Sequence, residues 1–263
     1  MRRILQSILS LCGGVLFAAA ALAATLPRAE APGQLRVMTD AALLPPLQRI
    51  IRDYAVANHQ SVTLISTATK NPARLIEEGA EADLLISADP ALRQTLEHRG
   101  QIDVFATPPI ATAELAMVAK KGAFAANTLS ESLSLAALLY GEGAKTRIVI
   151  LDPARSVLGA HSFAALRMQN IAPEQVTFVA DAASLSAALM EPDTLGIMLA
   201  PEAIADANLE LLTLLPDSPE VTMEFTALVI AGDGMDSARD FLKYLEESSA
   251  QKHLAHFGFT PRH

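Results

Sequence analysis

The sequence predicts an α/β protein, because short apolar runs alternate with segments whose apolar residues recur at helical spacing. Of the 263 residues, 51% are hydrophobic, which is enough for a sizeable core, and the formal net charge is −9. A disordered chain has less apolar content, and a nucleic-acid binder normally carries a basic excess. A single cysteine excludes a disulfide-stapled or zinc-ribbon protein. These exclusions leave a globular protein with one domain or with two domains of modest size.

Residues 1–24 have the pattern of a secretory signal peptide. Two arginines precede an apolar run from Ile4 to Ala24, and the run ends in an A-x-A stretch. We expect cleavage after Ala23 or Ala24 and export to the periplasm, with a retained membrane anchor as the alternative interpretation. Because Cys12 lies inside this segment, the mature chain has no cysteine and no thiol chemistry.

Strands and helices alternate through the first half of the mature chain. Pro45 and Pro46 are tolerated in a helix only in its first turn, so they mark a helix start. Glycines follow the next two helical segments and are typical helix ends. The run at 83–87 is apolar, which is typical of a strand buried on both faces. The predicted elements are strands at 34–38, 62–65 and 83–87, and helices at 43–58, 72–78 and 90–99.

The same alternation continues in the second half, where the apolar runs are rich in β-branched residues. No internal repeat and no long low-complexity linker divides the chain. Any two domains must therefore be joined by short strand-like connections. The predicted elements are strands at 115–119, 147–151, 176–179, 195–199 and 225–231, and helices at 132–140, 159–170, 184–190 and 236–257.

The sequence contains no motif of an enzyme active site. A nucleophile elbow, a phosphate-binding loop, a zinc-protease motif and a dinucleotide motif are all missing from it. His253 and His256 lie three apart on the last predicted helix but lack a third ligand for a metal. We interpret them as solvated residues of a helix end, and His161 as a structural residue. We therefore expect no enzyme activity, no metal site and no cofactor.

Several segments resemble the periplasmic molybdate-binding proteins of ABC transporters. Residues 73–89, A-R-L-I-E-E-G-A-E-A-D-L-L-I-S-A-D, are similar to the family segment L-x-x-Q-I-E-x-G-A-P-A-D-x-F-I-S-A-D, which is the most specific match. Four shorter segments also resemble the family. Residues 35–43 are similar to its first strand and A-A-A-S-L turn, and residues 152–159 to its D-P-x-x-x-P-A-G turn. Residues 195–199 are similar to its G-I-x-Y strand, and residues 257–259 to its closing Y-G-F. The matches follow family order over nearly the whole mature chain.

The resemblance implies a type II periplasmic binding fold, in which two α/β lobes are joined by two crossover strands and the ligand lies in the cleft between them. We expect lobe I at 34–110 plus 226–263 and lobe II at 111–225, with crossings near 108–113 and 224–227. The resemblance further implies a monomeric solute-binding protein of an ABC importer. It would bind a small oxyanion of the molybdate or tungstate type and deliver it to an inner-membrane permease.

The resemblance also assigns ligand-binding positions. The family's two serines fall on Ala42, which has no hydroxyl, and on Thr69, which keeps one. The family's tyrosine falls on Leu199, so its phenol is lost. Leu158 takes the place of one backbone donor at a helix start, and Ala183, or Ser184 after a small gap, takes the place of another. N–H groups and the helix dipole favour an anion at such positions.

Two cations in the same loops, Lys70 and Arg155, are candidate replacements for the lost donors. Asp40 would repel an anion if it faced the cleft, and we expect it instead to cap the following helix. A pocket of mixed charge formed by Asp40, Lys70 and Arg155 would fit an organic or zwitterionic solute, which stays open as an alternative ligand. A sensor or assembly protein that keeps the fold with an empty cleft is the other alternative.

Overall fold

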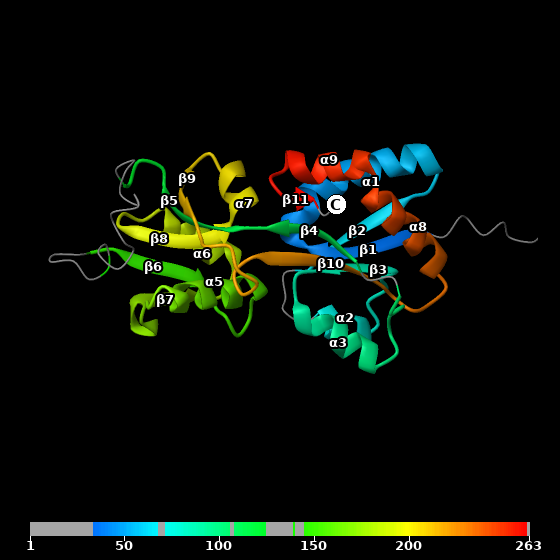
Figure 1. The fold of residues 1–263 in the computed structure, drawn as a ribbon, viewed down its shortest axis with the longest axis horizontal. Coiled ribbons are helices and arrows are strands. Elements are labelled where there is room, and N and C mark those ends of the chain that lie inside the picture. Colours follow the sequence, from blue (N-terminus) through cyan, green and yellow to red (C-terminus); the bar gives the residue numbers. More distant parts are fainter. Residues whose placement is uncertain (1–33, 68–71, 106–107, 125–138, 140–144, 262–263) are drawn as a thin grey trace, which may run out of the picture. The chain divides into compact units, whose positions relative to one another are not determined.

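The computed structural model describes residues 34–67, 72–105, 108–124, 139 and 145–261. The predicted signal peptide, nearly all of the predicted helix at 132–140, and the candidate ligand residues Thr69 and Lys70 lie outside the described residues. None of the helices in the described part is long and apolar enough to cross a membrane. The architecture is α/β, as predicted, with two mixed sheets that carry helices on their faces (Figure 1).

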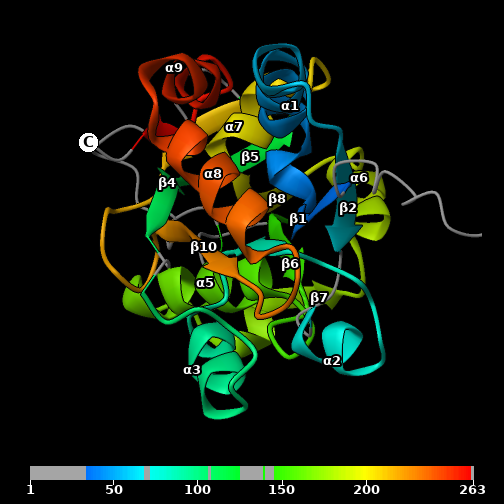
Figure 2. The same cartoon turned by 90° about the vertical axis from the view of Figure 1, so that its right-hand side faces the viewer.

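The first sheet has six strands in the order β11-β4-β10-β3-β1-β2. Strands β1, β2 and β3 run parallel, and β10 pairs antiparallel with both β3 and β4. The helices α1, α8 and α9 cover one face, and α2 and α3 cover the other (Figures 1 and 2). The bounds are β1 Leu35–Asp40, β2 Val62–Thr67, β3 Leu84–Ser87, β4 Pro109–Ala113, β10 Met223–Val229, β11 Thr260–Pro261, α1 Leu44–Asn58, α2 Pro72–Glu77, α3 Pro90–His98, α8 Met235–Glu246 and α9 Ser248–His256.

Burial on both faces explains why the parallel strands of this sheet read as continuous apolar runs. Successive side chains of a strand point to opposite faces. Val37 packs in one buried cluster with Leu47 of α1, whereas its neighbour Met38 packs in another with Leu92 and Leu96 of α3. Each strand of this kind therefore serves two cores.

The second sheet has five strands in the order β7-β6-β8-β5-β9. Strands β6, β7 and β8 are parallel, and β5 pairs antiparallel with β8 and β9. Ile148 of β6 belongs to the cluster that holds Leu166 of α5, and its neighbour Val149 belongs to the cluster that holds Leu185 of α6. The bounds are β5 Leu115–Lys120, β6 Arg147–Leu151, β7 Val176–Val179, β8 Thr194–Leu199, β9 Leu209–Leu214, α5 Val157–Met168, α6 Ala182–Leu189 and α7 Ala200–Ala205.

The structure corrects the prediction of one long helix at 236–257. Glu247 has extended backbone (φ −68°, ψ 148°), so it ends α8 and α9 begins directly after it. Both helices bury apolar residues against the same core, and the apolar spacing therefore gave no sign of the break. Three further elements are missing from the sequence prediction: α7 and the edge strands β9 and β11. Helix α7 follows β8 with no loop residue between them, so its start lies inside an apolar stretch.

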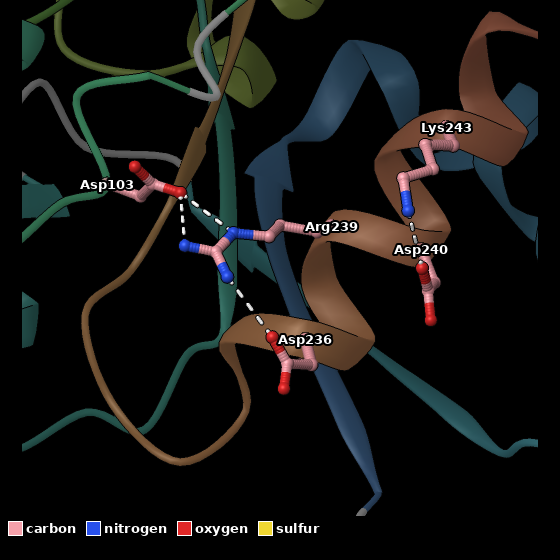
Figure 3. Close-up of polar contacts among 5 residues, drawn as sticks. All are labelled: Asp103, Asp236, Arg239, Asp240 and Lys243. Atoms are coloured by element: carbon pink, nitrogen blue, oxygen red, sulfur yellow. Dashed lines mark hydrogen bonds and ion pairs between the residues drawn. The ribbon is translucent and has the colours of Figure 1, made fainter.

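An ion pair ties α8 to the loop that follows α3. The Arg239 guanidinium donates from Nε and Nη2 to Oδ2 of Asp103 at 2.8 and 2.7 Å, and its Nη1 lies 3.1 Å from Oδ1 of Asp236 (Figure 3). The hydrogen bonds from Arg239, and then that from the N–H of Phe105, hold the pKa of Asp103 below its ordinary value. The nearby pair of Lys243 and Asp240 is exposed, and such pairs contribute little stability.

Candidate functional site

A cavity of about 230 Å³ is lined by residues at the carboxyl ends of parallel strands from both sheets. Asp40 and Thr67 end β1 and β2, Leu151 and Leu199 end β6 and β8, and Ala180 directly follows β7. This is the edge at which α/β sheets place their ligands, because loops and helix N-termini converge there.

The cavity brings together most of the predicted ligand positions that the structure describes. Ala42, Arg155, Leu158 and Leu199 all line it, whereas Ala183 does not. Two larger hollows, of about 850 and 570 Å³, are lined by none of these residues. The candidate site is therefore the smaller cavity at the strand ends.

The start of α5 forms one wall. Ser156 caps this helix by accepting a hydrogen bond from the Gly159 N–H at 3.2 Å. A Cβ on Gly159 would lie 2.4 Å from the carbonyl oxygen of Leu151, so only glycine lets the helix start so close to the end of β6. As a result Leu158 lies in the wall of the cavity, and its N–H is a first-turn group without an acceptor inside the helix.

The start of α6 has a different chemistry. Asp181 caps it by accepting the Ser184 N–H at 2.8 Å. Hydrogen bonds from Ser184, and a smaller contribution from the N–H of Ala183, hold the pKa of Asp181 below its ordinary value, and the charge of Arg155 lowers it further. The Asp181 carboxylate therefore accepts hydrogen bonds from the backbone N–H groups around Ala183, which we expected to bind the anion.

Asp40 does not cap the following helix, contrary to our expectation, since its side chain makes no capping hydrogen bond. Its Oδ2 instead accepts the N–H of Ala88 at 3.0 Å, because β1 lies beside β3 in the sheet and Ala88 directly follows β3. Burial raises the pKa of Asp40 to about 6, against the opposing effect of the Ala88 hydrogen bond, and the charge of Asp89 raises it further.

A second partly buried carboxyl group, that of Glu202 in the first turn of α7, lines the same cavity as the partly buried Asp40. Burial raises its pKa, and the charge of Asp40 adds to the effect, so the two groups are close enough to repel. The Thr67 hydroxyl beside them is buried; it lies near enough to Asp40 to lower the pKa of that group slightly, yet makes no hydrogen bond of ordinary geometry with a described residue.

Sequence reasoning missed Thr67, Asp181 and Glu202 as site residues. Each lies two or three positions beyond a predicted strand; these strands are at 62–65, 176–179 and 195–199. Because α/β folds bind ligands at the carboxyl ends of strands, the predicted strand ends could have indicated these residues.

The cavity wall combines charged groups and three hydroxyl side chains, those of Thr67, Ser156 and Ser186, with a larger apolar part. Three carboxyl groups and one guanidinium are among its described lining residues. The apolar members are Ala41, Ala42, Leu151, Val157, Leu158, Ala180, Ala182, Leu185, Met198, Leu199, Met223 and Phe225. This arrangement can enclose a small solute and fix its orientation through a few polar groups, as ligand pockets do.

The histidines lie elsewhere. Nδ1 of His161 is 2.9 Å from the carbonyl oxygen of Glu220, and Nε2 of His253 is 2.7 Å from Oδ2 of Asp53. The described residues contain no cluster of three or more metal-ligating side chains. Each of these two histidines therefore contacts a residue that lies far from it in the sequence.

Comparison with known proteins identifies the group to which this architecture belongs. The sequence profile of the family described as bacterial extracellular solute-binding protein matches residues 35–260. The chain belongs to this family. Its members are solute-binding proteins of transporters and not enzymes, in agreement with the missing catalytic motifs.

The similarity to molybdate-binding proteins is distant but covers most of the chain. The molybdate-binding protein ModA of Escherichia coli is 25% identical over 233 residues, which cover 87% of this chain and 89% of that protein. ModA of Haemophilus influenzae is 24% identical over 239 residues, covering 88% and 92%. The periplasmic molybdate-binding protein of Azotobacter vinelandii superposes with a TM-score of 0.70 at 17% identity, covering 88% and 100%. The predicted family resemblance and the two-lobe α/β fold are thereby confirmed.

Proposed function

We propose that this solute-binding protein is the periplasmic component of an ABC importer and holds its solute in the 230 Å³ cavity at the strand ends. The observation that carries the proposal is the convergence there of Ala42, Arg155, Leu158 and Leu199. Ala42, Leu158 and Leu199 came from the family's ligand shell, and Arg155 is a candidate replacement donor from the loop before Leu158. All four line one cavity in the expected place for an α/β fold.

In this proposal, the protein works by binding and closure. Residues 34–110 and 226–263 form one lobe and residues 111–225 the other, with β4 and β10 as the connections. A solute that contacts both lobes favours the closed arrangement, as in hinge closure of other two-lobe binding proteins. The closed form is then the signal that a permease in the inner membrane recognises.

A molybdate-type oxyanion is one candidate solute. It is supported by the names of the relatives and by the first turn of α5, where the N–H of Leu158 and the helix dipole favour an anion. Ala42 and Leu199 offer it no side-chain donor, and Asp181 occupies the start of α6. A hydrogen bond to a charged group contributes about 1.5–3 kcal/mol, so two missing bonds weaken an oxyanion complex by orders of magnitude.

An organic or zwitterionic solute is the second candidate. It is favoured by the carboxyl groups of Asp40 and Glu202, which line the cavity within a largely apolar wall. Fixed carboxylates repel an oxyanion and attract a cationic group, so this pair separates the two candidates by charge.

The test of binding is the melting temperature of the mature chain with molybdate, tungstate, sulfate, phosphate or amino acids. A solute at a hundred times its dissociation constant stabilises the folded protein by about 2.7 kcal/mol. The substitution Ala42→Phe fills the cavity and should abolish the shift. Ala187→Phe, on the exposed side of α6, is the control that should keep it. A shift that survives Ala42→Phe would place binding elsewhere, and no shift with any solute would favour the sensor or assembly role.

A further inference from the structure

We infer that the solute carries an ammonium group, which Asp40 and Glu202 bind together at the end of the cavity formed by β1 and α7. The inference rests on the proposed solute-binding function and names the chemistry of the ligand. It differs from the expectation of an oxyanion, because it requires a positive charge at this end of the cavity.

The first support is the pair of carboxyl groups itself. They come from separate elements, face one cavity and repel each other. Buried charges are normally paired with an opposite charge, yet no lysine or arginine among the described residues forms an ion pair with Asp40 or Glu202. An ammonium group between them would neutralise both, and the apolar wall would strengthen the attraction.

The second support is independent of charge. The side chain of Thr67 is only 4% exposed, lines the same end of the cavity, and has no hydrogen-bond partner of ordinary geometry among the described residues. A buried hydroxyl group is normally satisfied. Its oxygen could accept an N–H of the ammonium group, so one ligand group would satisfy the hydroxyl and both carboxylates.

Arg155 provides a partner for a second charged group of such a solute. Arg155 lines the cavity beside the start of α5 and forms no ion pair with a described carboxylate. Its charge nevertheless helps to lower the pKa of Asp181. An anionic group of a zwitterion would bind there. Met198 and Leu199 would contact the carbon skeleton of the solute. This explains why the apolar Leu199 stands at the position where the oxyanion-binding family has a side-chain donor. A water takes about 30 Å³, so 230 Å³ holds roughly seven waters, enough for a small organic solute.

The proposal fixes the sign of the pH dependence of binding. Among the described residues, the titratable and charged groups that line the cavity are Asp40 from β1, Glu202 from α7, Asp181 from the start of α6 and Arg155 before α5. The charge of Asp89, directly before α3, also acts on Asp40. Asp40 ionises at about pH 6, and the pKa of Glu202 is raised. An ammonium ligand must therefore bind more tightly as the pH rises from about 5 to about 7. An oxyanion must do the reverse, since protonated carboxyl groups no longer repel it.

The experiment measures melting-temperature shifts of the mature protein with two ammonium probes that carry N–H donors, γ-aminobutyrate and putrescine, at millimolar concentration. Butyrate serves as the analogue of γ-aminobutyrate without the ammonium group, and molybdate and phosphate serve as anions. Each shift is taken relative to the same variant without solute. We expect at least one ammonium probe to stabilise the protein more at pH 7 than at pH 5, and butyrate to have no effect.

Asp40→Asn and Glu202→Gln keep the shape and remove the charge. Each should weaken the ammonium probe about 10- to 100-fold, the loss expected for one hydrogen bond to a charged group. Asp233→Asn and Glu191→Gln, both on exposed residues, should leave the affinity unchanged. If molybdate or phosphate stabilises the protein and Asp40→Asn strengthens that effect, the inference is wrong while the solute-binding function stands. If no solute of either sign stabilises it, both are wrong.

Discussion

Removal of the charge of Asp40 should make the ligand-free protein more stable at neutral pH. The pKa of Asp40 rises from 3.8 to about 6 in the folded state, chiefly through burial, so ionisation of this group opposes folding. The group is protonated in both states below about pH 3, where it leaves stability unaffected, and stability falls as the pH rises from there to about 6. Roughly two pKa units at 1.36 kcal/mol each give about 3 kcal/mol at pH 7. The amide of Asp40→Asn keeps an acceptor for the Ala88 N–H and avoids this cost.

The assay is urea unfolding of wild type and Asp40→Asn at pH 7 and at about pH 3, without solute. We expect the variant to unfold at a higher urea concentration at pH 7, with a gain of up to about 3 kcal/mol, and to match the wild type at the acidic pH. Asp233→Asn, on an exposed loop, should change neither value. Equal stability of wild type and Asp40→Asn at pH 7, or the same gain at both pH values, would refute the reasoning.

Four further predictions follow from the same structure. Gly159→Ala should destabilise the protein by about 1–3 kcal/mol, because its Cβ would overlap the Leu151 carbonyl; Gly232→Ala, with nothing within 4 Å, is the control in the same unfolding assay. Ser156→Ala should cost about 1 kcal/mol through the lost helix cap, measured as a lower urea midpoint. Arg239→Met should lower the melting temperature at pH 7, because the ion pair with Asp103 is lost. The difference in melting temperature from wild type should shrink as falling pH protonates Asp103, and an equal difference at about pH 3 would contradict this. Amino-terminal sequencing of the exported protein should begin at residue 24 or 25; an intact first residue would contradict signal-peptide cleavage.

Most of the fold could be predicted because it follows from local pattern. The strand at 176–179 and the strand at 147–151 have the predicted bounds, since three or four apolar residues between turn signals define them. The break at Glu247 could not be predicted, because it depends on a change of backbone direction that leaves the apolar spacing intact. Helix α7 has the same difficulty, since its first residue continues the apolar run of β8.

The sequence predicted where the candidate site lies, but not which carboxyl groups line it. Family motifs directed attention to Ala42, Leu158 and Leu199, which do line one cavity. Glu202 escaped notice because its role depends on the approach of two elements that are far apart in sequence. Asp40 was assigned to a cap, the commoner use of such a residue. Only the neighbouring position of Ala88, set by the pairing of β1 with β3, shows where its carboxylate binds.

The most direct test of the central claim uses the fact that this chain contains no tryptophan. A single tryptophan introduced by Ser186→Trp lies at the cavity wall, whereas Ala187→Trp lies on the exposed side of the same helix. If the cavity binds the solute, a titration with the stabilising ammonium probe should change the emission of Ser186→Trp with the same midpoint as the thermal stabilisation, and leave that of Ala187→Trp unchanged. Equal responses of both reporters, or an unchanged Ser186→Trp emission while the probe still stabilises the protein, would contradict the account.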